Sequence, residues 1–350
     1  MCAVINNMIK VIVVIVMFIM FSGCAWASEQ ASIFVYHRFG DQRYPSTNID
    51  VEVFASQLEY LRQNDYNVLY VSDIVRRLKD GIELPPRCVA LTVDDGYISF
   101  LSGGMPLLRQ YNYPVTLFVS SDTVGSGSYL NWQQLGQLHS EGVELGNHSE
   151  MHPYFVSAEV KDQAGWRAKA QADIQSAQQA FMSHLGVVPN LFAYPYGEYS
   201  PAMEELLREL GFLAAFAQQS GVVDPEACQN SCYRLPRFPM GGLFATLVGF
   251  KSKATMRPLP IKILSPLSPV LSAQDPPGMV FTIDSTDITL STLRCYVQGQ
   301  QEAEVEVLGG GKYRICAAAP LSGRRNKYTL TAQSKDGKTW YWFSQLWIHP

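Results

Sequence analysis

The stretch CVALTVDDG, residues 88–96, runs from an apolar segment into two adjacent carboxylates and a glycine. A short apolar run of this kind predicts a buried strand in a mostly parallel sheet. Open α/β sheets and (β/α) barrels carry their chemistry at the C-terminal ends of such strands. Because Asp94 and Asp95 repel each other and resist burial, they predict a compensating cation or proton. A solvated Asp-Asp-Gly turn is the alternative interpretation.

Short apolar runs alternate with amphipathic segments on both sides of this stretch. The other runs that predict strands in the first part of the chain lie at 33–37, 68–71, 114–120, 142–146, 191–194 and 212–216. Capping residues mark helix starts, as at Asn131 and at the pair Ser200-Pro201. One long helix is expected from about 158 to 185. The alternation predicts a parallel α/β sheet, either open or closed into a barrel.

The pattern changes after Lys253. Residues 257–278 contain many prolines and few helix signals, which is typical of a linker or an extended connection. From residue 279 onward, apolar residues alternate with a period of two between Gly, Asn and Asp turns, which predicts a small all-β sandwich of immunoglobulin type. The expected organisation is a first domain at 28–256, a linker, and a β-domain at 279–350.

The overall composition narrows the classes of partner. The 350 residues are 47% hydrophobic and 17% charged, which suits the cores of one large or two medium domains. The net charge of −4 argues against a surface built to bind nucleic acid or another polyanion. A neutral or weakly charged substrate fits this charge better.

The N-terminus predicts export. A basic residue precedes an unbroken apolar run at 11–21, and small residues follow, as in a secretory signal at 1–27. The run is short for a membrane span. AWA at 25–27 resembles an A-x-A cleavage site, whereas FSGC at 21–24 resembles a bacterial lipobox that leaves Cys24 lipidated and membrane-anchored. We expect the protein in the periplasm or cell envelope, either free or lipid-anchored.

The seven cysteines fit an oxidising compartment. Two pairs, Cys228 with Cys232 and Cys295 with Cys316, are expected as disulfides, and Cys88 is expected as a buried free thiol in its strand. Zinc binding by Cys228 and Cys232 is the alternative, but no second Cys/His pair lies near them in the sequence.

The segment HSEMHP, residues 148–153, supplies a partner for the carboxylates. It follows the expected strand at 142–146, so its histidines should lie on the same sheet face as Asp95. His148 and His152 can turn toward one metal ion, and with Asp95 they give three ligands and an open position, as in catalytic zinc sites. A surface or capping pair of histidines is the alternative interpretation.

These motifs resemble those of the polysaccharide deacetylases, carbohydrate esterases that share the NodB homology domain. TVDDG at 92–96 resembles the first motif of that family, HSEMHP at 148–153 the second, and AYPYG at 193–197 the third. The resemblance extends from about residue 33 to residue 253. It implies that the first domain is a distorted (β/α) barrel of NodB type.

The resemblance also implies a site and a mechanism. Its metal ligands are Asp95, His148 and His152, and the expected cofactor is a divalent cation, Zn²⁺. The cation would polarise the acetamide carbonyl and activate its bound water as the nucleophile. Asp94 would act as the general base, and the backbone N–H of Tyr196 would help to hold the oxyanion.

Two positions depart from the family pattern. Ala193 stands where many members have an arginine that orients the base; Arg237 is the expected replacement, and a surface arginine is the alternative. A late L-x-H motif that supplies the general acid is missing, because His349 is the only histidine after His184. His37, at the end of the first expected strand, is the expected replacement, and a packing histidine is the alternative.

The sequence therefore favours an exported, metal-dependent hydrolase that removes N-acetyl groups from a polysaccharide containing N-acetylglucosamine. YHRF at 36–39 also resembles the subgroup that acts on the biofilm exopolysaccharide poly-N-acetylglucosamine. The β-domain is expected to position the enzyme or to bind a protein or glycan partner. A non-catalytic carbohydrate-binding protein is the alternative; Ala193 and the missing histidine favour it, whereas the unligated Asp94 argues against it.

Overall fold

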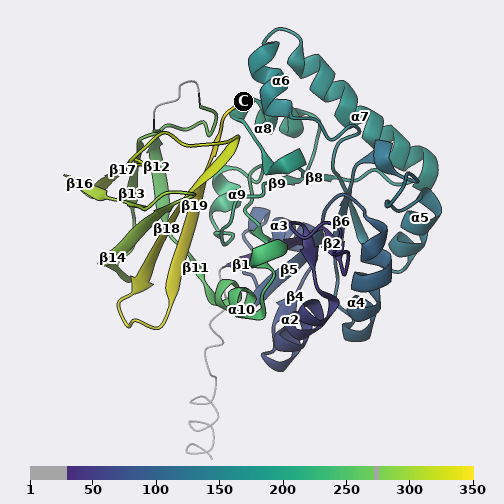
Figure 1. Ribbon diagram of the computed structural model, residues 1–350, viewed down its shortest axis with the longest axis horizontal. Helices are drawn as coiled ribbons and strands as arrows, with labels where there is room; N and C mark the ends of the chain where they lie inside the picture. The colour runs from purple at the N-terminus through teal and green to yellow at the C-terminus, as the bar shows by residue number, and fades with distance from the viewer. Residues whose placement is uncertain (1–29, 272–275) are drawn as a thin grey trace, which may run out of the picture.

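The computed structural model describes residues 30–271 and 276–350. It consists of a parallel β-sheet with helices around it and, beside this, two mainly antiparallel sheets (Figure 1). We call the part up to residue 256 the barrel and the part from residue 257 the β-region.

The barrel sheet has the strand order β10-β1-β5-β6-β7-β8-β9, with β4 beside β5, and its strand pairs are parallel. Its strands are β1 Ala31–Tyr36, β4 Asn67–Val68, β5 Cys88–Val93, β6 Thr116–Val119, β7 Glu144–Asn147, β8 Leu191–Ala193, β9 Ala214–Phe216 and β10 Phe238–Pro239. A parallel bridge joins Phe216 to Leu235, just before β10, so the sheet curls back toward its first edge. The expected α/β fold, a distorted (β/α) barrel, is confirmed.

Helices pack outside this sheet (Figure 1). They are α2 Val51–Gln63, α3 Val71–Lys79, α4 Met105–Tyr111, α5 Trp132–Ser140, α6 Phe155–Lys161, α7 Trp166–Leu185, α8 Pro201–Glu209, α9 Ala227–Asn230 and α10 Leu247–Thr255. The single helix expected at 158–185 is wrong, because α6 and α7 are separate. The Asp162 carboxylate accepts the Gly165 N–H at 2.9 Å, and such a local bond competes with helix continuation.

Shorter elements complete the barrel. They are the strand pair β2 Arg38–Phe39 and β3 Asn48–Ile49, the π-helical turn η1 Phe100–Gly104, and the 3₁₀ turns η2 Ser121–Thr123, η3 Pro195–Gly197 and η4 Gly242–Phe244. Several of these elements follow directly on the C-terminal ends of barrel strands, where the motif residues also lie.

The register of the strands brings the motif residues to one edge of the barrel. Every residue of β1 and β5 is buried, which explains their unbroken apolar sequences. Tyr36 of β1 pairs with Val93 of β5, so His37 and Asp94 leave neighbouring strands at the same level. His148 follows β7, which runs parallel two strands further along.

The β-region contains two sheets, in the orders β11-β19-β18-β14-β15 and β12-β13-β17-β16. Its strands are β11 Arg257–Pro258, β12 Ile261–Ser265, β13 Met279–Ile283, β14 Ile288–Val297, β15 Glu302–Ala303, β16 Val305–Gly309, β17 Lys312–Ile315, β18 Arg325–Ser334 and β19 Trp340–Ile348. The sheets share a core that includes Phe281, Leu330 and Trp347. The expected linker, 257–278, contains β11 and β12, which pair with β19 and β13.

The cysteines follow the sequence expectations in part. Cys228 and Cys232 form a disulfide, as expected. The expected disulfide between Cys295 and Cys316 is wrong, because both thiols are free: Cys295 is buried in the core of the β-region, whereas Cys316 is exposed. Cys88 is buried and free as expected, and burial raises the pKa of its thiol to about 12.

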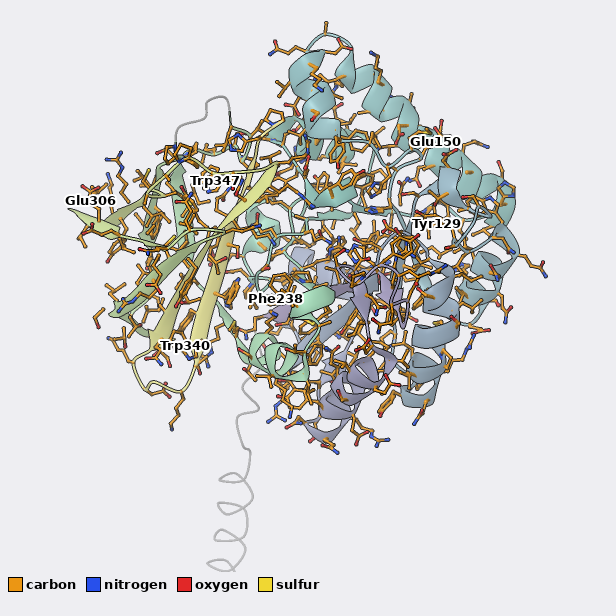
Figure 2. All side chains as sticks on the ribbon, viewed as in Figure 1. Tyr129, Glu150, Phe238, Glu306, Trp340 and Trp347 are labelled. Carbon is orange, nitrogen blue, oxygen red and sulfur yellow. A yellow bond between two sulfur atoms is a disulfide. The ribbon has the colours of Figure 1, made fainter. Side chains whose placement is uncertain are left out.

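The β-region packs against the barrel through β19. Figure 2 labels Phe238 of the barrel at this junction, and its ring centroid lies 5.8 Å from that of Trp342. The indole N–H of Trp342 donates to the Ser220 carbonyl at 3.1 Å. Leu346 and Ile348 are buried in one apolar cluster with barrel residues, so a continuous apolar contact joins the two parts.

The expected secretory signal at 1–27, with Cys24, lies outside the described residues. Among the helices that the structure describes, none is both long and apolar enough to cross a membrane.

Candidate active site

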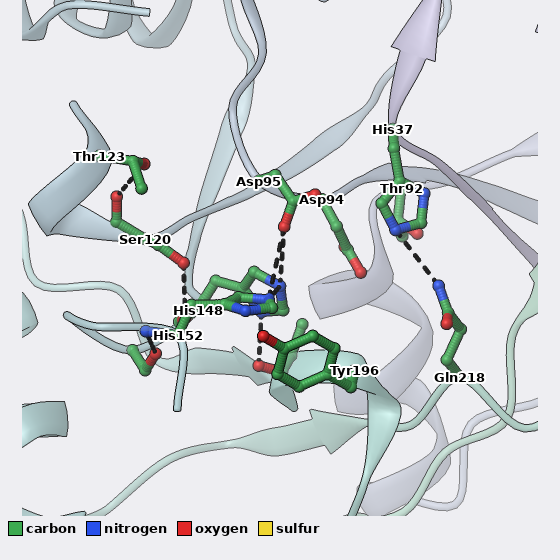
Figure 3. A network of polar contacts seen from close by, with 12 residues as sticks. His37, Thr92, Asp94, Asp95, Ser120, Thr123, His148, His152, Tyr196 and Gln218 are labelled. Atoms are coloured by element: carbon green, nitrogen blue, oxygen red, sulfur yellow. Dashed lines mark hydrogen bonds and ion pairs between the residues drawn. The ribbon is translucent and has the colours of Figure 1, made fainter. Parts of the chain in front are cut away.

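Three side chains from two strand ends converge at one edge of the barrel (Figure 3). Asp95 follows β5, and His148 and His152 follow β7. Oδ1 of Asp95 lies 3.3 Å from Nε2 of His148 and 3.6 Å from Nε2 of His152. The two Nε2 atoms are 3.2 Å apart. We call these three residues the triad.

The triad fits a tetrahedral metal ion. Zinc bonds to nitrogen and oxygen of about 2.0–2.2 Å place neighbouring ligand atoms about 3.4 Å apart in a tetrahedron. The three separations in the triad, 3.2, 3.3 and 3.6 Å, scatter around that value. Within residues 30–271 and 276–350, no other group of three His, Cys, Asp or Glu side chains is suitably close. Two imidazoles and one carboxylate suit a divalent cation such as Zn²⁺.

The backbone orients the ring of His148. Its Nδ1 lies 2.8 Å from the carbonyl oxygen of Ala193. Because a carbonyl only accepts, Nδ1 carries the proton and Nε2 is left to face the triad. Burial lowers the pKa of His148. The hydrogen bond to Asp95 and the charge of Asp94 raise this pKa by more, so the net shift is upward. A bound cation would take the place of the proton that this shift favours.

The other two members of the triad are in the protonation states that bind metal. Burial raises the pKa of Asp95, but the hydrogen bond from His148 and the nearby histidine charges lower it more, so the net shift is downward. Burial and the charge of His148 lower the pKa of His152 to about 4. At neutral pH the site therefore offers a carboxylate and an uncharged imidazole.

Unusual backbone conformations occur at the triad and beside it. Asp95, Ser149, His152 and Tyr196 have φ of 73°, 69°, 51° and 58°. These are four of the seven non-glycine residues with positive φ in the described chain. Each such conformation costs about 1–3 kcal/mol and persists only where surrounding contacts enforce it.

Contacts from outside the sequence motifs hold the histidine loop in place. Asp173 of α7 accepts the backbone N–H groups of Glu150 and Met151 at 3.0 Å each. The hydroxyl of Ser120 donates to the His148 carbonyl at 2.9 Å. The sequence did not single out Asp173, because a carboxylate on a polar helix face carries no motif signal.

Asp94 is paired with Arg237. Nη1 and Nη2 of Arg237 donate to the two carboxylate oxygens of Asp94 at 2.7 Å each. Nη1 also donates to the Thr92 hydroxyl at 3.2 Å, and Nε donates to the Ala217 carbonyl at 3.1 Å. Arg237 is 0% exposed and Asp94 is 2% exposed, so Arg237 is no surface residue. Burial raises the pKa of Asp94, but the charges of Arg237 and His148 lower it more, and the net shift is downward.

His37 lies beside the carboxylates, at the end of β1. A positive charge on this ring would lower the pKa of both Asp94 and Asp95, so His37 lies within electrostatic reach of both. Its Nε2 lies 3.2 Å from Nε2 of Gln218 (Figure 3). Because an amide nitrogen only donates, Nε2 of His37 accepts and the neutral ring carries its proton on Nδ1. The sequence did not single out Gln218, although its position just after β9 is a strand-end signal.

Tyr196, in η3, borders the triad through a contact with His152. Its ring centroid lies 4.5 Å from that of His152, with the planes at 70°. Tyr196 also stacks on Tyr154, with ring centroids 3.8 Å apart and planes at 7°. The structure therefore brings together the residues that the motifs indicated, which are His37, Asp94, Asp95, His148, His152, Tyr196 and Arg237.

Known deacetylases resemble this chain in sequence. A family model described as polysaccharide deacetylase matches residues 81–215. The poly-beta-1,6-N-acetyl-D-glucosamine N-deacetylase of Escherichia coli (strain K12) is 24% identical over 220 residues, which cover 53% of this chain and 32% of the relative. A protein of the same name from Staphylococcus epidermidis is 23% identical over 217 residues, covering 60% of this chain and 74% of the relative. The chain thus spans about a third of the length of the Escherichia coli relative, 32%.

Solved structures resemble the chain over a similar extent. IcaB from Ammonifex degensii is 27% identical, with a TM-score of 0.56, and the match covers 64% of this chain and 95% of that chain. The Streptococcus pyogenes deacetylase PplD, in complex with acetate, shares the fold at 20% identity, with a TM-score of 0.56 over 64% of this chain and 98% of that chain. Residues 81–215 are therefore similar to the polysaccharide deacetylase family, and the chain shares sequence and fold with proteins that are named as deacetylases.

Proposed function

We propose that this protein hydrolyses the N-acetyl groups of an N-acetylglucosamine polymer with the help of a divalent cation. One observation carries the proposal: the two adjacent carboxylates have different partners. Asp95 faces the two histidines, whereas Asp94 is held by Arg237. This difference supports a division of roles in which one carboxylate binds a cation and the other takes a proton, a division that a sugar-binding protein does not need.

The triad would hold the cation, and we propose Zn²⁺ because two imidazoles and a carboxylate with an open position are typical of catalytic zinc. When bound, the cation supplies a Lewis acid for the acetamide carbonyl and lowers the pKa of a water molecule in the open position. The Ala193 carbonyl fixes the His148 ring for this purpose.

Asp94 is the proposed general base, which takes a proton from the attacking water. The guanidinium of Arg237 keeps the carboxylate ionised, because it lowers the pKa of Asp94 against the effect of burial. Its two parallel hydrogen bonds also fix both oxygens before substrate arrives. Arg237 thereby takes the orienting role for which Ala193 has no side chain.

Two further groups complete the proposed reaction. The backbone N–H of Tyr196 would donate to the oxyanion that develops on the acetamide oxygen. His37 would give a proton to the departing amine, since it lies beside both carboxylates and its ring is oriented by Gln218. The amine stays on the sugar and acetate leaves.

The names of the similar proteins support poly-β-1,6-N-acetylglucosamine as the polymer. We propose that the protein meets this polymer in the periplasm or cell envelope, since residues 1–27 resemble a secretory signal and Cys24 a lipid-bearing residue. The proposed role of the β-region is to support the site, with a partner protein or glycan as the alternative.

Acetate release from poly-β-1,6-N-acetylglucosamine, chitin oligomers and peptidoglycan, with and without chelator, tests the proposal. We expect release from the first polymer, its loss with chelator and its recovery with Zn²⁺. Asp94→Asn should bind the metal as wild type does but lose at least about 100-fold in kcat, whereas the exposed-site control Asp80→Asn should lose nothing. No release from any of the polymers by the metal-loaded protein would contradict hydrolysis and favour a carbohydrate-binding protein.

A further inference from the structure

Two neighbouring arginines of the β-region reach across to the site in the barrel. Arg325 begins β18, and Arg324 precedes it. Nη1 of Arg325 donates to the carbonyl oxygen of Tyr196 and lies 3.5 Å from Oε1 of Gln218. Arg324 donates through Nε and Nη2 to the two carboxylate oxygens of Glu198, at 2.6 Å each. We call Arg324 and Arg325 the arginine pair.

The partner of Arg324 is a buried carboxylate. The side chain of Glu198 is 1% exposed, whereas that of Arg324 is 28% exposed. A buried carboxylate is strongly unfavourable without a counter-charge, and here the β-region supplies it. Nε of Arg325 lies a further 4.0 Å from the same carboxylate. The arginine pair therefore fixes the chain two residues beyond Tyr196.

Arg325 acts on Tyr196 itself. Tyr196 has φ 58° and ψ 3°, a left-handed conformation that a tyrosine adopts only under constraint. These two angles set how the N–H of Tyr196 is oriented relative to its carbonyl, so a contact that holds the carbonyl also holds the N–H. Arg325 holds the carbonyl, and on the following residue the Gly197 N–H donates to Tyr194 at 2.7 Å. We expect that, without Arg325, the residue relaxes toward an extended conformation and its N–H turns away.

The same pair supports the rings that border the triad. The guanidinium of Arg324 lies 4.1 Å from the ring centroid of Tyr154. Tyr154 stacks on Tyr196, whose ring edge-packs with His152. The contacts thus run without a gap from the β-region to a member of the triad.

Arg325 also sets the orientation of an amide. Because Nη1 can only donate, the nearby Gln218 atom is the carbonyl oxygen Oε1, and the amide nitrogen then faces Nε2 of His37. The tautomer of His37 is therefore tied to Arg325 through one side chain.

We propose that Arg324 and Arg325 are positioning residues, through which the β-region completes the catalytic site by fixing the Tyr196 peptide and the Gln218–His37 pair. The proposal rests on the proposed deacetylase function. It predicts that the β-region contributes to turnover rather than to substrate affinity alone.

The test compares Arg325→Met and Arg325→Lys with wild type in the full-length, metal-loaded protein. Arg314→Met is the matched control, because Arg314 lies on β17 with an exposed side chain that pairs only loosely with Glu306, at 3.8 Å. Steady-state acetate release gives kcat and KM, and hydrogen–deuterium exchange reports the amides of residues 194–199. We expect Arg325→Met to lower kcat about tenfold or more with KM within about twofold of wild type, and to speed exchange in the loop. Arg325→Lys should recover part of kcat, with metal affinity unchanged in every variant.

The outcomes separate this proposal from the one on which it rests. Absence of acetate release by wild type would contradict the proposed function alone, because loop exchange still reports whether Arg325 holds the Tyr196 peptide. Wild-type kcat and wild-type exchange in Arg325→Met would overturn the positioning role. A loss confined to KM would also overturn it, since Arg325 would then contact substrate directly. An equal loss in Arg314→Met would overturn it as well, because the effect would not be specific to the arginine pair.

Discussion

At the scale of single residues, the site depends on one buried ion pair. Asp94 and Arg237 are 143 positions apart in sequence and form two hydrogen bonds inside the barrel. The carboxylate alone at this position would be a buried charge without compensation. The pairing makes an ionised carboxylate, which we propose as the base, compatible with burial, and the geometry of the guanidinium fixes where its oxygens point.

Arg237→Leu should uncouple that pair. The variant leaves Asp94 buried without a counter-charge, so we expect a loss of about 3–5 kcal/mol in the free energy of unfolding. We also expect at least about a 100-fold fall in kcat/KM, because the base loses its orientation and its ionised form is disfavoured. Denaturant unfolding and acetate release measure the two effects. Arg294→Leu, at an exposed arginine whose partner Glu302 is also exposed, should show neither.

The stabilisation that Arg237 gives to the folded protein should depend on pH. Arg237 holds the folded-state pKa of Asp94 below its ordinary value. The stabilisation from the pair is therefore fully present above about pH 4, the unfolded pKa of an aspartate, and is lost as pH falls through the folded pKa. The stability gap between wild type and Arg237→Leu should shrink on acidification below about pH 4. A gap that is constant with pH would contradict an ionised Asp94.

The sequence predicted which residues form this site better than it predicted which residues they contact. Strand-end carboxylates and the spacing of His148 and His152 carry a local pattern, so the triad could be inferred from short motifs. Arg237 could be named only as a candidate, because no local signal shows which arginine crosses the barrel. Gln218 and Asp173 act through single hydrogen bonds to distant segments, and such contacts leave no trace in spacing or periodicity.

At the scale of elements, the site depends on turns that follow strands. η3 follows β8 and passes beside Gln218. In η3, Gly197 packs directly against Gln218. A Cβ at Gly197, which has φ of 70°, would lie 2.3 Å from the Gln218 nitrogen and 2.7 Å from its Cα. Only glycine fits there, for reasons of both conformation and space.

Gly197→Ala should therefore lower the free energy of unfolding by more than an alanine at another position with the same positive φ. Gly186, at the end of α7, has nearly the same φ of 71° but nothing within 4 Å of its Cβ position. We expect Gly186→Ala to cost about 1 kcal/mol of stability and to keep full activity. Gly197→Ala should cost at least about 2 kcal/mol more and abolish most acetate release, because the Gln218 main chain must move. Thermal unfolding and turnover of both variants measure this, and equal costs at the two glycines would contradict the close packing of η3 against Gln218.

Element types were largely predictable, whereas their boundaries were not. Buried strands gave unbroken apolar runs, and Asn131 caps α5 as expected. The break between α6 and α7 depends on the Asp162 side chain, which helical periodicity does not reveal. β11 and β12 were hidden in a proline-rich segment, because their pairing partners lie far away in sequence.

At the scale of the whole molecule, the barrel and the β-region form a shared interface. The sequence indicated a separate all-β part, but its contact with the barrel had no signal, since Leu346 and Ile348 look like ordinary strand residues. In the structure they are buried among barrel side chains. On the same face, Lys327 of β18 lies directly opposite Leu346, so a cation is directed into this interface.

Lys327 makes the stability of this interface pH-dependent. Burial, with the charges of Arg325 and Lys253, lowers the pKa of Lys327 to about 8. An unfolded lysine titrates near about 10.4, so between these values the folded protein binds fewer protons than the unfolded chain, and its stability rises with pH. Lys327→Met removes this titration together with the cost of burying the charge. We therefore expect Lys327→Met to be more stable than wild type at pH 7 and the gap to close toward about pH 10.

Denaturant unfolding of both proteins between pH 7 and about pH 10 measures that gap. Lys312→Met, at an exposed lysine of β17, is the matched control and should follow wild type at every pH. Comparing variants at equal pH removes the contribution of other groups that titrate in this range, notably the buried tyrosines. A gap that does not change with pH would mean that Lys327 is not desolvated in the folded protein. In that case the barrel and the β-region would be less tightly packed around β18 than the structure shows. The arginine pair, which lies next to Lys327, would then not be held rigidly enough to position Tyr196.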